Sequence, residues 1–264
     1  KLNKQLEENK KLSEEIINNE KFKNDYFVNL SHELRTPINV ISSILQLINS
    51  MIGNNTMTYE KAKDYTKIIG RNCENLLKII NDIIDSSKIE TGNYIINKKD
   101  DDIVYVVEET ALSMSKFIEE EGLTLIIDPD MEEKVISFDR TEIERVIINL
   151  LGNAVKFTPK GNNIYFVIIV SKIRVFIKEI QNHIEITVED TGLGISKEDQ
   201  EFIFKRFSQI KDENYTKASS SGIGLTLVKY IAELHGGYIK LESEVGKGSK
   251  FTIVLPDILE RNII

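Results

Sequence analysis

Apolar residues recur at intervals of three and four between residues 30 and 48, which is the pattern of an amphipathic helix with one buried face. The members of this stripe are Leu30, Leu34, Ile38, Ile41, Leu45 and Ile48. The pattern predicts a helix that continues to about Met51, where Gly53, Asn54 and Asn55 break it.

A second helix is predicted to follow and to end near Gly92, because glycine suits the C-terminal cap of a helix. Its apolar face consists of Ala62, Tyr65, Ile69, Leu76, Ile80 and Ile83. Two antiparallel helices cannot bury both stripes by themselves, whereas a dimer that forms a four-helix bundle can. We therefore expect a homodimer, with Cys73 on the inward side of the second helix.

Residues 1–21 are polar and carry a broken heptad of apolar residues, which predicts a short coiled-coil helix in front of the hairpin. Asn9 and Ser13 stand where apolar residues would fit, so this helix is not expected to be stable alone. It either transmits a signal to the bundle or is the solvated end of the first helix.

His32 lies two residues from both Leu30 and Leu34, and therefore about 200° around the helix from them at roughly 100° per residue. We expect the imidazole to point away from the core beside Glu33, with Pro37 kinking the helix. An exposed imidazole next to a carboxylate suits a group that another part of the protein must reach. The spacing is also that of an ordinary surface histidine on a helical bundle.

Beyond Gly92 the pattern changes to strands mixed with helices, so we place a domain boundary at about residue 93. Strands are expected at residues 94–97, 123–128, 135–138, 164–171, 174–179, 183–189, 237–242 and 248–255, and helices at residues 102–120, 141–157, 197–207 and 223–234. Strands joined mostly by hairpins and mixed with helices indicate an α+β two-layer sandwich. The expected domains are the coiled coil at 1–21, the helical hairpin at 22–92, the α+β domain at 93–258 and a tail at 259–264.

Composition narrows the class of protein. The 264 residues carry a net charge of −8, which argues against a nucleic-acid partner, because phosphate backbones attract clustered Lys and Arg. The single cysteine fits a reducing compartment, so we expect this portion to be cytoplasmic. No apolar run approaches the length of a membrane span. The chain opens on Lys1, and we expect a piece of a longer protein that reaches a membrane only through a segment outside this chain.

The helix expected at residues 141–157 has a polar face that stands out from its apolar surroundings. Asn149, Asn153 and Lys156 share one side of this helix, at positions i, i+4 and i+7. Magnesium accepts amide oxygens as ligands and lysine binds phosphate, so this face suits a metal-nucleotide complex. The alternative is the exposed edge of a half-buried helix.

Two glycine-rich loops follow that helix in the chain. Asp190 ends a predicted strand and could accept a hydrogen bond from an exocyclic amine such as that of adenine, while Gly192 and Gly194 allow a flat ring or a sharp turn close to the backbone. Such a loop is by itself often just a turn. Gly222 and Gly224 lead into the last predicted helix, whose N-terminal amides offer an anion site.

Two sets of motifs resemble those of sensor histidine kinases. Residues 31–37, SHELRTP, resemble the phosphoacceptor box of that family. The polar helix and the two glycine loops, in this order, resemble the ATP-binding domain (the Bergerat fold) shared by histidine kinases, Hsp90, DNA gyrase and the mismatch-repair ATPases. Phe204 and Phe207 match the phenylalanine box of the kinase branch, and residues 234–237 and 246–251 match its closing segments. The resemblance covers about residues 22–256.

The resemblance implies a homodimeric kinase that binds ATP with Mg²⁺, phosphorylates His32 and passes the phosphoryl group to an aspartate of a response regulator. Glu33 would orient the imidazole or deprotonate it at its other nitrogen, Asn153 would bind the metal, and Thr36 would position water for dephosphorylation of that partner. The ATP-binding residues implied are Asn149, Asn153, Lys156, Phe157, Asp190, Gly192, Gly194, Ile195, Phe204, Phe207, Gly222, Gly224 and Leu225.

Asn149 also separates two branches of that fold. The hydrolysing members carry a glutamate at this position as the base for water, and an amide cannot take that proton, so phosphoryl transfer to His32 is favoured over hydrolysis. Ser220 and Gln209 depart from the common kinase pattern, and the polar residues 211–221 suit either a lid over the phosphates or an ordinary loop. A nucleotide-binding scaffold, or a phosphatase-biased member with weak kinase activity, is the alternative.

Overall fold

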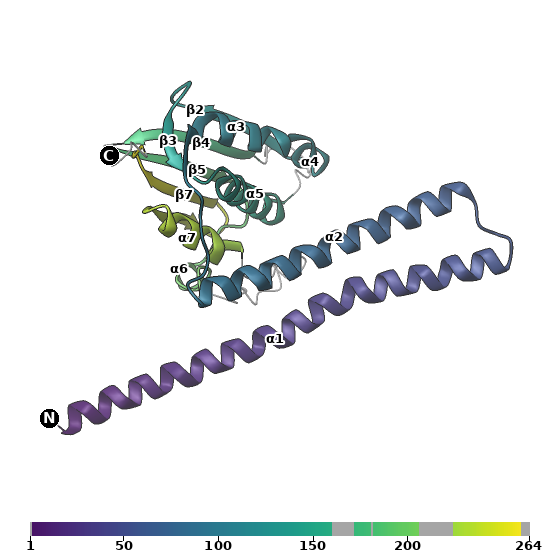
Figure 1. The fold of residues 1–264 in the computed structure, drawn as a ribbon, viewed down its shortest axis with the longest axis horizontal. Helices are drawn as coiled ribbons and strands as arrows, with labels where there is room; N and C mark the ends of the chain where they lie inside the picture. The colour runs from purple at the N-terminus through teal and green to yellow at the C-terminus, as the bar shows by residue number, and fades with distance from the viewer. Residues whose placement is uncertain (1, 160–171, 181, 206–223, 260–264) are drawn as a thin grey trace. The chain divides into compact units, whose positions relative to one another are not determined.

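The computed structural model describes residues 2–159, 172–180, 182–205 and 224–259 (Figure 1). The chain divides into two compact units, Lys1–Lys88 and Ile89–Ile264. The strand expected at residues 164–171 lies outside the described residues, as do Phe207, Gln209, Ser220, Gly222 and the segment 211–221.

The first unit is a hairpin of two long helices, α1 (Leu2–Gly53) and α2 (Tyr59–Glu90). α1 starts within the predicted coiled-coil segment and continues without a break through Pro37. None of the described helices combines the length and the apolar character that a membrane span requires.

The ends of these helices lie at the predicted breaking residues 53–55 and the predicted glycine cap Gly92, and Thr58 adds an N-terminal cap to α2. Asn55 in the connection has a left-handed φ of 55°. Thr58 Oγ1 accepts a hydrogen bond from the Lys61 amide at 3.3 Å, which caps α2 at its N-terminus. Gly92 has a φ of 68°, the conformation that a glycine cap after a helix requires.

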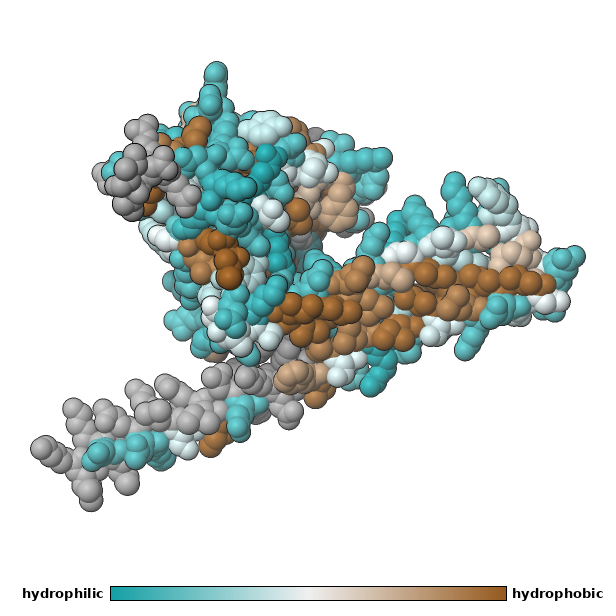
Figure 2. All heavy atoms as spheres, viewed as in Figure 1, coloured by the Kyte–Doolittle hydropathy of each residue, from teal (hydrophilic) through white to brown (hydrophobic). Residues whose placement is uncertain are grey.

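Large apolar side chains remain exposed along the hairpin, and Figure 2 shows them as a brown band that follows both helices. Ile38 and Leu45, which were expected on a buried face, are each 49% exposed. A lone hairpin has no second layer of helices to cover this band, as the pattern indicated. Cys73 is also exposed in this chain, so its predicted inward position is wrong for the single hairpin.

The second unit contains two sheets. The two-stranded sheet pairs β1 (Lys99–Asp102) with β3 (Val135–Phe138). The five-stranded sheet has the order β2 (Thr124–Pro129), β4 (Lys172–Ile180), β5 (His183–Asp190), β7 (Gly248–Pro256) and β6 (Tyr238–Glu244). Only β2 and β4 run parallel among these described pairs, and the others are antiparallel.

The helices of this unit cover one face of the larger sheet. They are α3 (Ile103–Ser113), α4 (Ser115–Glu120), α5 (Arg140–Phe157), the short α6 (Lys197–Gln200) and α7 (Gly224–Leu234). α5 packs on β4 and β5 and contacts both α3 and α7, and α7 packs on β6 and β7. Along β6 exposed residues alternate with partly buried ones, because one face of the strand meets solvent. The predicted two-layer α+β class is confirmed.

Three elements differ from the prediction. Residues 94–97 form no strand; Tyr94 is instead buried, and its hydroxyl donates to Glu142 Oε2 at 2.7 Å. The helix predicted at residues 102–120 is divided at Met114 into α3 and α4. The helix predicted at residues 197–207 ends at Gln200, and residues 201–204 form turns. The spacing of apolar residues reports neither the contact of Tyr94 with Glu142, 48 residues away, nor the ends of these helices.

Candidate functional site

The polar face of α5 is held in place by a buried apolar face on the same helix. Asp139 caps the N-terminus by accepting a hydrogen bond from the Glu142 amide at 3.3 Å. Ile143, Val146, Ile147, Leu150, Leu151 and Ala154 are buried in the core. Asn149, Asn153 and Lys156 are all partly exposed, so a ligand can reach this side of α5.

The C-terminal end of α5 lies against the loop that follows β5. The Leu193 amide donates to the Phe157 carbonyl at 3.1 Å. A Cβ atom on Gly192 would overlap the same carbonyl and the Asp190 carboxylate, so only glycine fits here without a shift of the backbone. The fold thereby brings Phe157 and Lys156 close to the Asp190 loop. The Lys156 ammonium lies 5.3 Å from the centre of the Phe157 ring.

Asp190 is the last residue of β5 and its side chain is buried. Oδ1 accepts hydrogen bonds from the Gly192 amide at 2.8 Å and the Ser249 amide at 3.3 Å. Among the described residues both donors reach Oδ1, so Oδ2 is the oxygen left to accept a hydrogen bond from a ligand. Burial raises the pKa of this carboxyl from 3.8 to about 6, although the two backbone hydrogen bonds oppose the shift.

The rest of this loop packs against the turn between β6 and β7. Gly194 has a φ of 69° and lies so close to the Glu244 carbonyl that a Cβ atom would overlap it. The Gly246 amide donates to the Leu193 carbonyl at 2.7 Å. Ile195 is partly buried against the core. These contacts fix the loop on the side away from α5.

The N-terminus of α7 approaches the middle of α5. A Cβ atom on Gly224 would stand 3.4 Å from Asn149 Oδ1, which is a tight contact. Thr226 Oγ1 donates to the Phe204 carbonyl at 3.3 Å, and the Phe204 ring meets Phe251 edge-on at 6.4 Å between centroids. Leu225 is partly buried against the same core.

The described residues predicted for ATP binding thus border one region of the second unit. α5 contributes the polar face, the loop after β5 contributes Asp190, and α7 contributes backbone amides with the positive end of a helix dipole. Phe207 and Gly222 were predicted for the same site and lie outside the described residues. The backbone amide of Ser249 was missed by the sequence analysis, because only the pairing of β5 with β7 brings it to Asp190.

The predicted phosphoacceptor residues lie on α1 in the other unit. The His32 side chain is exposed and Glu33 is partly exposed beside it. Thr36 Oγ1 donates to the His32 carbonyl at 3.1 Å, one turn back along the helix. The imidazole is therefore accessible, as its angle from the apolar stripe indicated.

His183 and His235 were not predicted to be functional residues. His235 is buried: its Nε2 accepts a hydrogen bond from the Asp139 amide at 3.0 Å, and Nδ1 lies 2.7 Å from the Ile231 carbonyl. This pair of contacts fits the tautomer with hydrogen on Nδ1. Burial lowers the pKa of His235, which favours the neutral ring. Through its two hydrogen bonds this ring connects the end of α7 to the start of α5.

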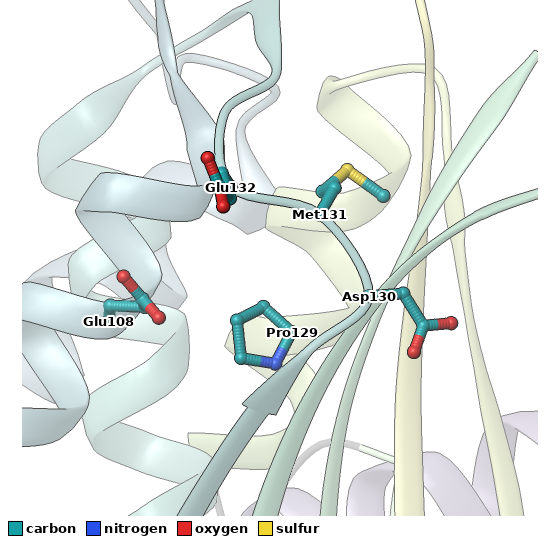
Figure 3. Close-up of a pocket in the computed structure, with 5 residues that line it drawn as sticks. All are labelled: Glu108, Pro129, Asp130, Met131 and Glu132. Atoms are coloured by element: carbon teal, nitrogen blue, oxygen red, sulfur yellow. The ribbon is translucent and has the colours of Figure 1, made fainter.

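A separate hollow of about 490 Å³ lies between α3 and the turn after β2 (Figure 3). Glu108, Pro129, Asp130, Met131 and Glu132 line it. Figure 3 shows that Asp130 points away from the other two carboxylates. No group of three metal-ligating side chains is found among the described residues. The hollow shares no residue with the predicted site, and nothing in its chemistry identifies a ligand.

Two family models match the chain. The model described as "His Kinase A (phospho-acceptor) domain" matches residues 22–92. The model described as "Histidine kinase-, DNA gyrase B-, and HSP90-like ATPase" matches residues 138–258. The first match contains His32, and the second contains α5, the Asp190 loop and α7.

Proteins named as histidine kinases are among those similar to this chain. The chain is 33% identical to the non-motile and phage-resistance protein of Caulobacter vibrioides over 94% of this chain and 28% of that protein. It is 33% identical to the circadian input-output histidine kinase CikA of Synechococcus elongatus over 89% of this chain and 30% of that protein. The chain therefore spans less than a third of either relative. A solved structure of the histidine kinase ThkA in complex with the response regulator TrrA shares the fold, with a TM-score of 0.64, 23% identity and coverage of 90% of this chain and 63% of that one.

Proposed function

This chain belongs to the histidine kinases, and on that premise we propose that it transfers the γ-phosphoryl group of ATP to His32 and then to an aspartate of a response regulator. The observation that carries the proposal is the exposure of His32 within a phosphoacceptor domain, on the same chain as an ATP-binding domain. One unit thus offers a nucleophile and the other offers the phosphate donor.

The geometry around Asp190 supports the binding of adenine. Its Oδ2 would accept a hydrogen bond from the exocyclic amine, while Oδ1 stays bound to the Gly192 and Ser249 amides. Gly192 and Gly194 keep the loop backbone free of side chains, so a flat ring can approach it. Phe157, Ile195, Phe204 and Leu225 would supply apolar contacts around the ring and ribose.

The polar face of α5 supports the binding of a magnesium-phosphate group. Asn153 would bind Mg²⁺ through its amide oxygen, and Lys156 would bind a phosphate oxygen. Asn149 lies beside Gly224, at the positive end of the α7 dipole, which suits the same anion. When bound, Mg²⁺ neutralises charge on the phosphates.

In the transfer step, the lone pair of His32 Nε2 attacks the γ-phosphorus in line with the leaving oxygen of ADP. The new N–P bond forms as the P–O bond to the β-phosphate breaks, and ADP leaves with that electron pair. Glu33 holds the proton on the other ring nitrogen and so keeps Nε2 available as the nucleophile. Asn149 cannot serve as a base for water, which favours transfer over hydrolysis.

The phosphohistidine would then be attacked by an aspartate of a receiver domain, which returns His32 to its neutral form. The solved complex of the similar kinase ThkA with a response regulator supports a partner of this class. Thr36 already donates its hydroxyl hydrogen to the His32 carbonyl, and its oxygen can still accept one from water. That arrangement supports a second role for Thr36, in hydrolysis of the phosphorylated regulator.

The exposed apolar band on α1 and α2 supports a homodimer in which two hairpins form a four-helix bundle. We place the coiled coil at residues 1–21, the phosphotransfer domain at 22–92, the ATP-binding domain at 93–258 and a tail at 259–264. ATP and a response regulator are both available in the cytoplasm, so this portion would act there, with any membrane anchor supplied by other parts of the protein.

Incubation with γ-labelled ATP and Mg²⁺ tests the proposal. Label that is stable to alkali and labile to acid should appear on the protein and move to an added receiver domain. His32→Gln should abolish labelling while ATP still binds, and Asp190→Asn should weaken ATP binding. The matched control is His183→Gln, because His183 is another exposed histidine outside the predicted site. Undiminished label on the His32→Gln variant would refute the assignment.

A further inference from the structure

Ser243, near the end of β6, joins three segments that surround Asp190. Its Oγ accepts a hydrogen bond from the Ile195 amide at 2.8 Å and donates to the Gly248 carbonyl at 2.9 Å. The Ser249 hydroxyl lies 3.0 Å from the same oxygen and can donate its hydrogen to it. One hydroxyl therefore links the loop after β5, the end of β6 and the start of β7.

Both of the segments held by Ser243 also contact Asp190. The Ser249 amide donates to Asp190 Oδ1, and Gly248, with a φ of 106°, packs directly on the Asp190 carbonyl. Ile195 closes the loop whose Gly192 amide donates to the same Oδ1 atom. Ser243 therefore contacts Ser249, which binds this carboxylate directly, and it holds the loop three residues beyond Gly192, which also binds it.

Gln200 reinforces the junction from the end of α6. Its Nε2 donates to the Ile195 carbonyl at 2.8 Å and to the Ser243 carbonyl at 3.0 Å. The two hydrogen atoms on this nitrogen thus bind Ile195 and Ser243, which are also linked by the hydrogen bond from the Ile195 amide to the Ser243 hydroxyl. The loop and the end of β6 are therefore held together by two side chains, Gln200 at the end of α6 and Ser243 in β6.

We propose that Ser243, supported by Gln200, is a positioning residue that sets selectivity for a nucleotide with an amino group at the purine 6-position. This inference rests on the proposed function, because it assumes that Asp190 binds that amine. A carboxylate discriminates an amine from a carbonyl only while its oxygen is held at the hydrogen-bonding position, since a mobile side chain can turn away from the wrong partner. Ser243 limits this motion through the two segments that hold Oδ1.

A merely structural role for Ser243 makes a different prediction. If the hydroxyl only stabilised the pairing of β6 with β7, its loss would weaken the binding of all nucleotides by a common factor. Comparing ATP with ITP separates the two cases, because ITP carries a carbonyl in place of the 6-amino group and a hydrogen on N1, while its ribose and triphosphate are the same.

The test measures the dissociation constants of ATP and ITP for the intact chain with Mg²⁺ by titration calorimetry. Wild type should prefer ATP, and Asp190→Asn should remove that preference. Ser243→Ala should lower the ratio of the ITP dissociation constant to the ATP dissociation constant about fivefold, which is the factor expected for one net hydrogen bond. Ser243→Thr keeps the hydroxyl and should restore the ratio. Glu242→Ala, on the exposed neighbour in β6, should leave the ratio unchanged.

If Ser243→Ala does not fold, Gln200→Met decides, because it removes only the two Nε2 hydrogen bonds from a residue outside the sheet. Unequal losses for ATP and ITP support the inference, and equal losses in the folded variants overturn it. A wild type without any preference for ATP, or an Asp190→Asn variant that keeps the preference, would instead refute the adenine contact of the proposed function.

Discussion

Replacing Asp190 with Asn should stabilise the nucleotide-free protein at neutral pH while it weakens ATP binding. The carboxyl is buried, and burial raises its pKa from 3.8 to about 6. The folded protein therefore holds the proton more tightly than the unfolded chain does. The destabilisation is absent below pH 3.8, grows as the pH rises from there, and is complete above about 6.

The size of this effect follows from the pKa shift. A shift of about two units at about 1.4 kcal/mol per unit gives a destabilisation of at most about 3 kcal/mol above pH 6. Asn keeps an oxygen that accepts from the Gly192 amide but carries no charge to desolvate. Since about 1 kcal/mol shifts the midpoint by roughly 2–4 °C in a domain of this size, the unfolding transition should rise by up to roughly 10 °C.

Scanning calorimetry of both proteins at pH 4 and pH 7.5, without nucleotide, measures the difference. Asp190→Asn should unfold at a clearly higher temperature at pH 7.5, and the gap should narrow at pH 4. Glu198→Gln is the control, because it removes a negative charge from an exposed side chain and should change the transition little. A lower transition temperature for Asp190→Asn at pH 7.5, or a gap that does not depend on pH, would show that burial does not strain this carboxylate.

Two further substitutions test the packing of the loop at Gly192 and the hydrogen bonds of Tyr94 to the N-terminal half of α5. Gly192→Ala should displace the loop and abolish measurable ATP binding, because its Cβ atom would overlap the Phe157 carbonyl and the Asp190 carboxylate. Gly152→Ala is the control, since a Cβ atom there meets nothing within 4 Å. Equal ATP affinities of the Gly192→Ala and Gly152→Ala variants would contradict the argument. Tyr94→Phe removes a hydroxyl that donates to Glu142 at 2.7 Å and accepts from Arg145 at 3.1 Å. It should lower the free energy of unfolding by about 1–2 kcal/mol in a urea titration, and an unchanged midpoint would mean that water replaces these bonds.

The helices whose apolar residues recur with the period of an α-helix could be predicted from the sequence. α5 and α7 have strong apolar faces, and the polar face of α5 stands out because the other residues of its C-terminal half, from Val146 to Phe157, are apolar or glycine. The position of His32 followed from its angle to a stripe on the same helix. In each case the residues that decide the outcome lie within a few turns of one another.

The missed features depend on residues that are far apart in the sequence. Asp102 ends β1 and caps α3, yet its Oδ1 also accepts from the Lys134 amide at 3.0 Å, and no local pattern announces that bond. His235 binds the backbone of Asp139, 96 residues away. The exposure of Cys73 has another cause, since the predicted core position assumes a second hairpin that a single chain does not supply.

The strain at Asp190 and the affinity for ATP have a common physical origin. A carboxylate in water discriminates poorly between hydrogen-bond donors, whereas the Asp190 carboxylate is buried away from water. The nucleotide-free folded protein is destabilised by this desolvation, and a hydrogen bond from a ligand amine offsets it. Bound ATP stabilises the folded state by RT ln(1 + [ATP]/Kd), which reaches about 3 kcal/mol at roughly 150 times the dissociation constant. Without nucleotide, the unfolding temperature of wild type should therefore be lower than that of Asp190→Asn. Near that ATP concentration, the unfolding temperature of wild type should become the higher of the two. A crossing of the two curves would tie the buried charge to nucleotide binding, whereas parallel curves would mean that Asp190 is strained for a reason unrelated to ATP.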